Sequence, residues 1–146
     1  MYTTVLIVHS LLRWAVILAG LVAAGTAWRE AQGWQTVRSG RVFAVLLDIQ
    51  VLAGLTLYFL LSQITRHAIR DVGAAMSNDV VRFWAIEHPV GMLAALVLAH
   101  IALARARRGL DIRLRRRVAI YFSLAAALVI LTTPWPFLPY GRPLLW

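Results

Sequence analysis

The sequence predicts an all-α integral membrane protein in which four spanning helices form an up-down bundle. Of the 146 residues, 61% are hydrophobic and 14% are charged, and the mean hydropathy is +0.74. A soluble domain is about 45–50% apolar and about 25% charged, and a soluble globule of this length cannot bury so much apolar surface. The composition therefore argues against a soluble enzyme or a free nucleic-acid-binding module.

Four apolar runs have about the length that a helix needs to cross a bilayer. They cover about residues 4–27, 42–62, 83–104 and 118–133. The first run lacks a preceding basic residue and is longer than a signal-peptide core, so we expect a retained span. The fourth run is the shortest and stops at Pro134, because proline blocks helix continuation. The tail that follows is expected to be extended, with its Trp and Tyr side chains at the lipid headgroups.

The connections between the runs are short enough for a sequentially wound bundle that forms a single domain, residues 1–146. The longest connection lies between the second and third runs. Within it, Ser77-Asn78-Asp79 is typical of a helix N-cap before the third span.

The distribution of arginine predicts the orientation. All 15 basic residues are Arg, against six acidic residues, for a net charge of +9. Ten of these arginines lie in the connections after the first and third spans, and four lie on the opposite side. Cytoplasmic loops carry the excess of positive charge, so both termini are expected in the periplasm of a bacterium, with the chain in the inner membrane. The positive charge then reflects topology, and no nucleic-acid partner is expected.

Six ionisable residues fall inside the predicted spans, where an Arg or Asp costs about 2.5–3.5 kcal/mol on insertion. They are His9 and Arg13 in the first span, Asp48 in the second, and Glu87, His88 and His100 in the third. Each such residue suggests either a functional site or a buried polar network.

His9 and His88 are the candidate metal ligands. At 1.5 Å per residue, both lie about 9 Å below the outer surface. Their spans are diagonal in a sequentially wound bundle, about 14 Å apart. This gap suits a porphyrin with one imidazole on each side of its iron, so the pair could hold a b-type haem. The alternative is two unrelated polar residues bonded to neighbouring helices. His67, near the outer end of the second span, is either a reserve ligand or an ordinary interfacial residue.

Arg13 lies one helical turn below His9 on the same face. It could neutralise a haem propionate, as could Arg66 or Arg70, or it could pair with an acid. Asp48 is the favoured partner, because it lies about 10 Å from the inner surface and so near the midplane.

Glu87 could orient an imidazole, relay protons to a quinol, or pair with Arg13 or Arg82. His100 is expected to be a hydrogen-bonding or interfacial residue near the cytoplasmic side. No second histidine accompanies it there, which argues against a second haem.

Three short blocks carry a resemblance to a known family. They are His9-Ser10-Leu11-Leu12-Arg13-Trp14, Arg82-Phe83-Trp84-Ala85-Ile86-Glu87-His88-Pro89 and Pro134-Trp135-Pro136. With these blocks the chain resembles a family of small bacterial four-helix membrane proteins that are loosely labelled cytochrome b. The resemblance implies a haem b, an electron-transfer role, and His9 and His88 as ligands. Larger b561-type cytochromes carry two histidine pairs, and here the inner pair is missing.

Two functions from different classes remain open. The first is a single-haem b-type carrier or subunit that exchanges electrons with a quinol or a periplasmic carrier, rather than a stand-alone enzyme. The second is a cofactor-free accessory subunit of a larger respiratory or photosynthetic complex, in which the polar residues fix the helix register. Besides the lipid bilayer, a larger membrane complex or a homo-oligomer is the expected partner. A quinone could fill the same gap as a haem.

Overall fold

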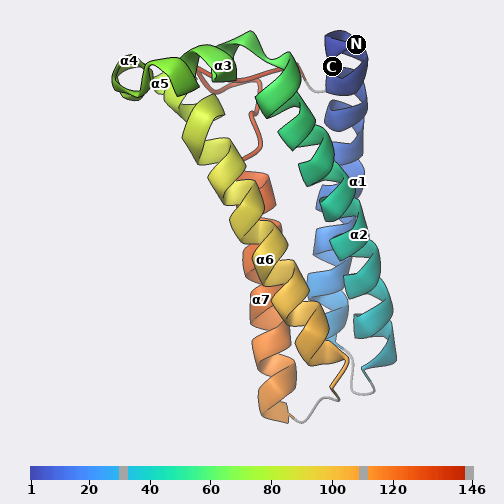
Figure 1. The fold of residues 1–146 in the computed structure, drawn as a ribbon. Coiled ribbons are helices and arrows are strands. Elements are labelled where there is room, and N and C mark those ends of the chain that lie inside the picture. The colour runs from blue at the N-terminus through green and yellow to red at the C-terminus, as the bar shows by residue number, and fades with distance from the viewer. Residues whose placement is uncertain (30–32, 109–111, 144–146) are drawn as a thin grey trace.

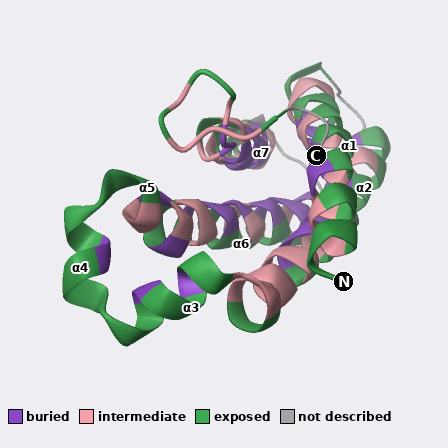
Figure 2. Ribbon diagram, turned by 90° about the horizontal axis from the view of Figure 1, so that it is seen from above, coloured by how far each residue is buried: buried purple, intermediate pink, exposed green. Residues whose placement is uncertain are grey.

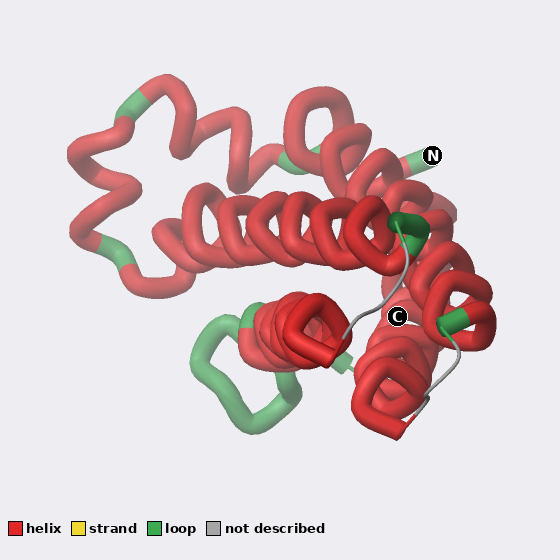
Figure 3. The backbone as a smooth tube through the Cα atoms, turned by 90° about the horizontal axis from the view of Figure 1, so that it is seen from below, coloured by secondary structure: helices red, strands yellow, loops and turns green. Residues whose placement is uncertain are grey.

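The computed structural model describes residues 1–29, 33–108 and 112–143. Within these ranges the chain forms helices and turns and contains no strand (Figure 3). The prediction of an all-α fold is therefore confirmed. The helices are α1 (Tyr2–Arg29), α2 (Trp34–Thr56), the π-helical η1 (Leu57–Leu61), α3 (Gln63–Arg70), α4 (Val72–Ser77), α5 (Asp79–Arg82), the π-helical η2 (Phe83–Glu87), α6 (His88–Ala106) and α7 (Ile112–Leu131).

Three continuous helical stretches of the described residues are long and apolar enough to cross a membrane. They are Tyr2–Arg29, Trp34–Leu61 and Asp79–Ala106, and they correspond to the first three predicted spans. The fourth predicted span falls within α7, which is not one of these stretches. Arginines occupy the first turns of α7, so only its later residues form an apolar run.

The four long helices pack in a ring. α1 contacts α2 and α7, and α6 contacts the same two helices from the other side. α1 and α6 are therefore diagonal to each other. The described N- and C-terminal ends lie at the same end of the bundle, opposite the C-terminal ends of α1 and α6 (Figure 1).

Small residues bring the helices close together in the core. The buried face of α6 carries a series of alanines, Ala95, Ala99, Ala102 and Ala106. Phe43 of α2 and Phe122 of α7 meet at the centre with ring centroids 6.3 Å apart. A Cβ on Gly40 would collide with the Phe122 ring, so Gly40 provides the space for this aromatic pair.

The short helices α3, α4 and α5 form an arm that projects from the end of the bundle with the termini (Figures 1 and 2). A side chain caps each of them. Ser62 accepts from the N–H of Thr65, Asp71 from that of Ala74 and Asn78 from that of Val81. The predicted N-cap at residues 77–79 is thus confirmed, with Asn78 as the capping residue.

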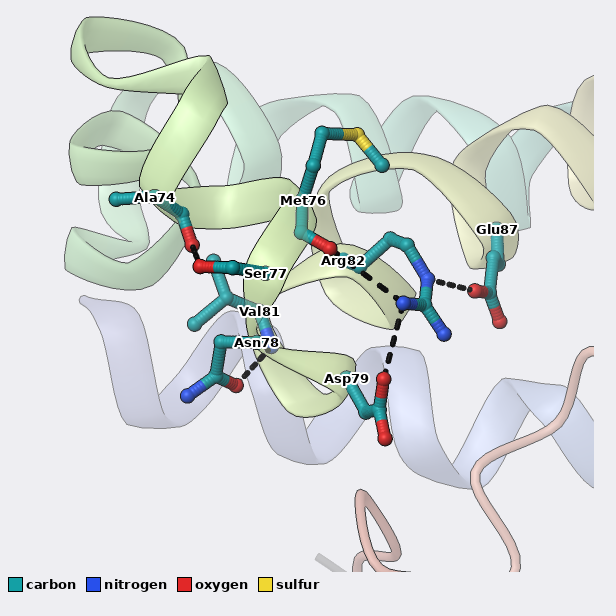
Figure 4. A network of polar contacts seen from close by, with 8 residues as sticks. All are labelled: Ala74, Met76, Ser77, Asn78, Asp79, Val81, Arg82 and Glu87. Atoms are coloured by element: carbon teal, nitrogen blue, oxygen red, sulfur yellow. Dashed lines mark hydrogen bonds and ion pairs between the residues drawn. The ribbon is translucent and has the colours of Figure 1, made fainter.

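Arg82 connects this arm to Glu87, the residue before α6, by an ion pair. Its guanidinium contacts Asp79 at 2.9 Å and Glu87 at 2.8 Å, and it donates to the carbonyl of Met76 at 3.5 Å (Figure 4). Of the partners considered for Glu87, the structure shows Arg82.

The tail after α7 is not extended. It folds back in tight turns, in which Leu138 N–H donates to the carbonyl of Trp135 and Arg142 N–H to that of Pro134. A Cβ on Gly141 would collide with the backbone of Trp135, so the turn requires glycine. The sequence analysis predicted an extended tail because prolines favour extended backbone. The folded tail is possible because its backbone N–H and C=O groups bond to one another in the turns.

Candidate functional site

A pocket opens between the long helices at the end of the bundle where the termini lie. The cavity has a volume of about 110 Å³. Most of its lining is apolar, and its polar side chains come from several elements, among them α1, α2, α3, α6 and the tail after α7. This composition is typical of a site for a small molecule or cofactor.

His9 and His88 meet in this pocket. Their ring centroids are 6.4 Å apart and their planes make an angle of 77°. Two imidazoles on opposite sides of one metal, with metal–nitrogen distances of about 2 Å, have ring centroids about 6 Å apart. The diagonal helices thus bring the two rings together in one pocket. No group of three or more His, Cys, Asp or Glu side chains with metal-binding geometry occurs in the described residues.

The hydrogen bond of His88 leaves one ring nitrogen for a ligand. Nδ1 lies 2.8 Å from the carbonyl oxygen of Thr132, and because that oxygen only accepts, Nδ1 carries the hydrogen. Nε2 therefore bears the lone pair. Metal-binding histidines are usually oriented by such a bond. Thr132 can supply the carbonyl because it follows the last residue of α7, where carbonyls lack helical partners.

Aromatic rings and a glycine hold His88 in place. The rings of Phe83 and Trp84 lie 5.9 and 5.6 Å from it, centroid to centroid. A Cβ on Gly91, one turn along α6, would collide with the side chain of Thr132. Gly91 thus allows α6 to approach the end of α7 closely enough for the bond between His88 and Thr132.

Gln50 of α2 holds His9. Its side-chain nitrogen donates to the His9 carbonyl at 3.1 Å and lies 3.3 Å from His9 Nε2. Gln50 is only 3% exposed. The other polar atoms of this contact, His9 Nδ1 and Gln50 Oε1, are buried without a hydrogen-bond partner among the described residues. A Cβ on Gly54 would lie 3.2 Å from the His9 ring, so Gly54 makes room for the imidazole.

Arg13 also lines the pocket, as predicted for a residue on the His9 face of α1. It is 6% exposed, and its guanidinium lies 5.3 Å from the Trp14 ring. Arg142 of the tail lines the mouth and lies 5.0 Å from the Trp84 ring. These two cations are the ones that could meet an anionic group of a bound ligand.

Asp48 does not lie where the sequence interpretation placed it. Its carboxylate accepts a 2.9 Å hydrogen bond from Nε2 of His100, outside the pocket. Both side chains are substantially exposed, 41% for Asp48 and 49% for His100. The position of Asp48 on the helix places its side chain on the side of α2 that faces α6, within reach of His100. It therefore does not point toward α1 and Arg13. The expectation of a hydrogen-bonding role for His100 is confirmed.

The remaining predicted residues lie on the arm. Nδ1 of His67 donates to the carbonyl of Gln63 at 2.7 Å within α3, and the residue is exposed, as are Arg66 and Arg70. None of the three lines the pocket. The structure therefore does not bring His67 to the histidine pair.

Two π-helical segments flank the pocket. Leu57 and Tyr58 of η1 and Trp84 of η2 line it, and the Tyr58 hydroxyl donates to the carbonyl of Ala85 at 2.9 Å, which joins the two segments. Short π-helical turns within α-helices occur frequently at functional sites. The sequence did not reveal them, nor the roles of Gln50, Thr132 and Arg142. The sequence did contain a signal for Gln50. It is a polar residue in a mostly apolar run, four positions before Gly54, which leaves space beside it.

A comparison with protein-family models, with curated proteins and with solved structures finds no match to this chain. The resemblance to the small cytochrome b-like family stays a prediction.

Proposed function

We propose that this chain is a single-haem b-type electron-transfer protein, or a subunit of a larger oxidoreductase, in the bacterial inner membrane. The haem would lie near the periplasmic face between His9 and His88. The observation that carries this proposal is the 6.4 Å separation of the two imidazole rings, which come from diagonal helices and meet in a mostly apolar pocket.

The orientation belongs to the same proposal. The three long apolar helices and α7 would cross the bilayer in an up-down order, with both termini in the periplasm. Ten of the 15 arginines then lie on the cytoplasmic side, as is typical of inner-membrane proteins. The pocket would open toward the periplasm, where a quinol or a periplasmic carrier could exchange electrons.

The side chains of the pocket have definable tasks in this proposal. His88 would bind through Nε2, since Nδ1 is held by Thr132. Arg13 and Arg142 would offset the negative charge of the haem propionates. Arg66 and Arg70 are exposed on α3 and could do so only from outside the pocket. When bound, the haem supplies a reversible one-electron couple. The apolar walls would exclude water from it.

One observation favours the rival proposal of a cofactor-free accessory subunit. The bonds between Gln50 and His9 and between His88 and Thr132 join α1 to α2 and α6 to the end of α7. Such bonds fix helix register in a membrane protein without any cofactor. A quinone in the same pocket is the remaining option.

An absorption spectrum of the detergent-purified protein, oxidised and then reduced, separates these proposals. We expect a Soret band with sharp reduced α and β bands, and about one haem per chain in a pyridine haemochrome assay. His9→Ala and His88→Ala should remove or alter this spectrum. His67→Ala and His100→Ala are matched controls that should preserve it. A colourless protein from haem-replete cells would reject the haem and leave the accessory subunit and the quinone.

A further inference from the structure

The contact between Gln50 and His9 has a consequence for ligand binding. The carboxamide nitrogen of Gln50 is only a donor, and it lies 3.3 Å from His9 Nε2. Nε2 must therefore present its lone pair to the amide. In a neutral imidazole the other nitrogen then carries the hydrogen, so Nδ1 of His9 is an N–H group.

Neither nitrogen of His9 can bind a metal in this arrangement. The lone pair of Nε2 is occupied by the amide, and Nδ1 has no lone pair in the plane of the ring. In the other tautomer, the N–H of Nε2 would face the amide nitrogen, so that two donors would meet. Exchanging the nitrogen and oxygen of the Gln50 carboxamide does not remove this conflict. Gln50 Oε1 would then face the His9 carbonyl oxygen, which in the structure accepts a 3.1 Å hydrogen bond from the amide nitrogen.

His88 differs from His9 in this respect. Its partner is a carbonyl oxygen, which leaves Nε2 with a lone pair in the pocket. The two histidines are thus unequal: one is ready to bind a metal, and the other is held by a neighbouring side chain. The buried Oε1 of Gln50 and Nδ1 of His9, both without a partner among the described residues, leave the held state short of two hydrogen bonds.

We infer that Gln50 is a latch on His9: the carboxamide of Gln50 must leave the imidazole before His9 could bind the iron of a haem. This inference rests on the proposed haem site and adds to it a residue that sets the affinity of the site. His88 could bind the iron without a rearrangement of its hydrogen bond, whereas His9 could bind it only after the Gln50 carboxamide has moved. The hydrogen bond from the amide to the His9 carbonyl need not break, since only the contact with the ring blocks the metal.

Substitution of Gln50 tests this inference on the full chain in detergent. Haemin is titrated into ligand-free protein, and its affinity and binding rate are compared among variants. Gln50→Leu and Gln50→Met have no donor, so both should bind haemin about fivefold to tenfold more tightly, which is the effect of one hydrogen bond on an equilibrium constant. Two variants are used because one of them could pack poorly. Gln35→Leu, at an exposed position of α2, is the matched control and should bind as the unmodified chain does.

A second readout needs no haem. The ¹⁵N chemical shifts of the His9 ring in ligand-free protein report which nitrogen carries the hydrogen. We expect the Nδ1–H form in the unmodified chain, and a shift toward a mixture of tautomers in Gln50→Leu. His9→Ala identifies the signal.

The outcomes separate this inference from the proposed function. Tighter haemin binding by the Gln50 variants, with the Nδ1–H form of His9 in the unmodified chain, supports the latch. Equal or weaker binding by both variants overturns it and leaves the haem site standing. An Nε2–H form in the unmodified chain overturns it as well. Failure of every chain to bind haemin rejects the proposed function and the latch together.

Discussion

The ring of Phe83 stacks on the ring of Tyr140, with centroids 3.6 Å apart and planes 12° from parallel. Phe83 belongs to η2 and lies beside His88, whereas Tyr140 belongs to the folded tail. This stack therefore joins the last described segment of the chain to η2, whose Trp84 lines the pocket. The contact of Arg142 with the Trp84 ring makes a second connection between the same two segments.

We expect Tyr140→Ala to loosen the tail and lower stability by about 1 kcal/mol, the usual size of an aromatic pair contribution. The thermal midpoint in detergent, followed by circular dichroism, measures this loss. Phe137→Ala is the matched control in the same tail, because Phe137 is 80% exposed and its ring contacts Trp135 of the tail, 6.4 Å between centroids, and not η2. A larger loss from the control than from Tyr140→Ala would contradict the assigned role of the stack.

Gly91→Ala should destabilise the fold by about 1–3 kcal/mol, because the new methyl group would overlap the side chain of Thr132. It should also weaken the bond that orients His88. Gly25→Ala is the control, since a Cβ at Gly25 meets nothing within 4 Å.

A double variant sharpens this prediction. Thr132→Ser removes the methyl group that the Cβ at position 91 would meet, so Gly91→Ala combined with Thr132→Ser should recover most of the stability. A double-mutant cycle on the thermal midpoints measures the coupling. Additive losses would show that the two residues do not interact in this way.

Asp48→Asn should lower stability only slightly, by less than about 1 kcal/mol, because the pair with His100 is exposed and such pairs contribute little. It should leave the pocket and any bound haem unchanged, since the pair lies outside the pocket. A change in the haem spectrum of Asp48→Asn would indicate that this carboxylate acts on the pocket after all.

The chain contains no Cys, so a single introduced cysteine reports orientation without interference. Ala74→Cys on the arm should react with a membrane-impermeant maleimide in intact spheroplasts. Gln35→Cys, at the opposite end of the bundle, should react only after the membrane is opened. The reverse pattern would place the termini in the cytoplasm and overturn the proposed topology.

Much of the fold could be predicted because it depends on composition and periodicity. The apolar runs predicted four spans, three of which coincide with long apolar helices, and the sequential winding placed His9 and His88 on diagonal helices at one level. The partners of the polar residues could not be predicted in the same way. They depend on the rotation of each helix about its axis, which decides that Gln50 faces His9 while Asp48, two residues earlier, faces His100.

The tail illustrates a different limit of sequence analysis. Its prolines favour an extended chain, but the turn at Gly141 and the hydrogen bond from Arg142 to Pro134 return it to the pocket. Arg142 thereby becomes a lining residue although it lies far from His9 and His88 in the sequence.

The π-helical segment η2 ends where the N–H of His88 donates to the carbonyl of Phe83, five residues earlier. Such a turn holds one residue more than an α-helical turn. Removal of a single residue from η2 would therefore convert this turn into an α-helical one, with the arm and the alanine face of α6 in nearly the same relative orientation. The change of one residue in chain length would thus be taken up within the turn beside His88 and would leave the rest of the helices in place.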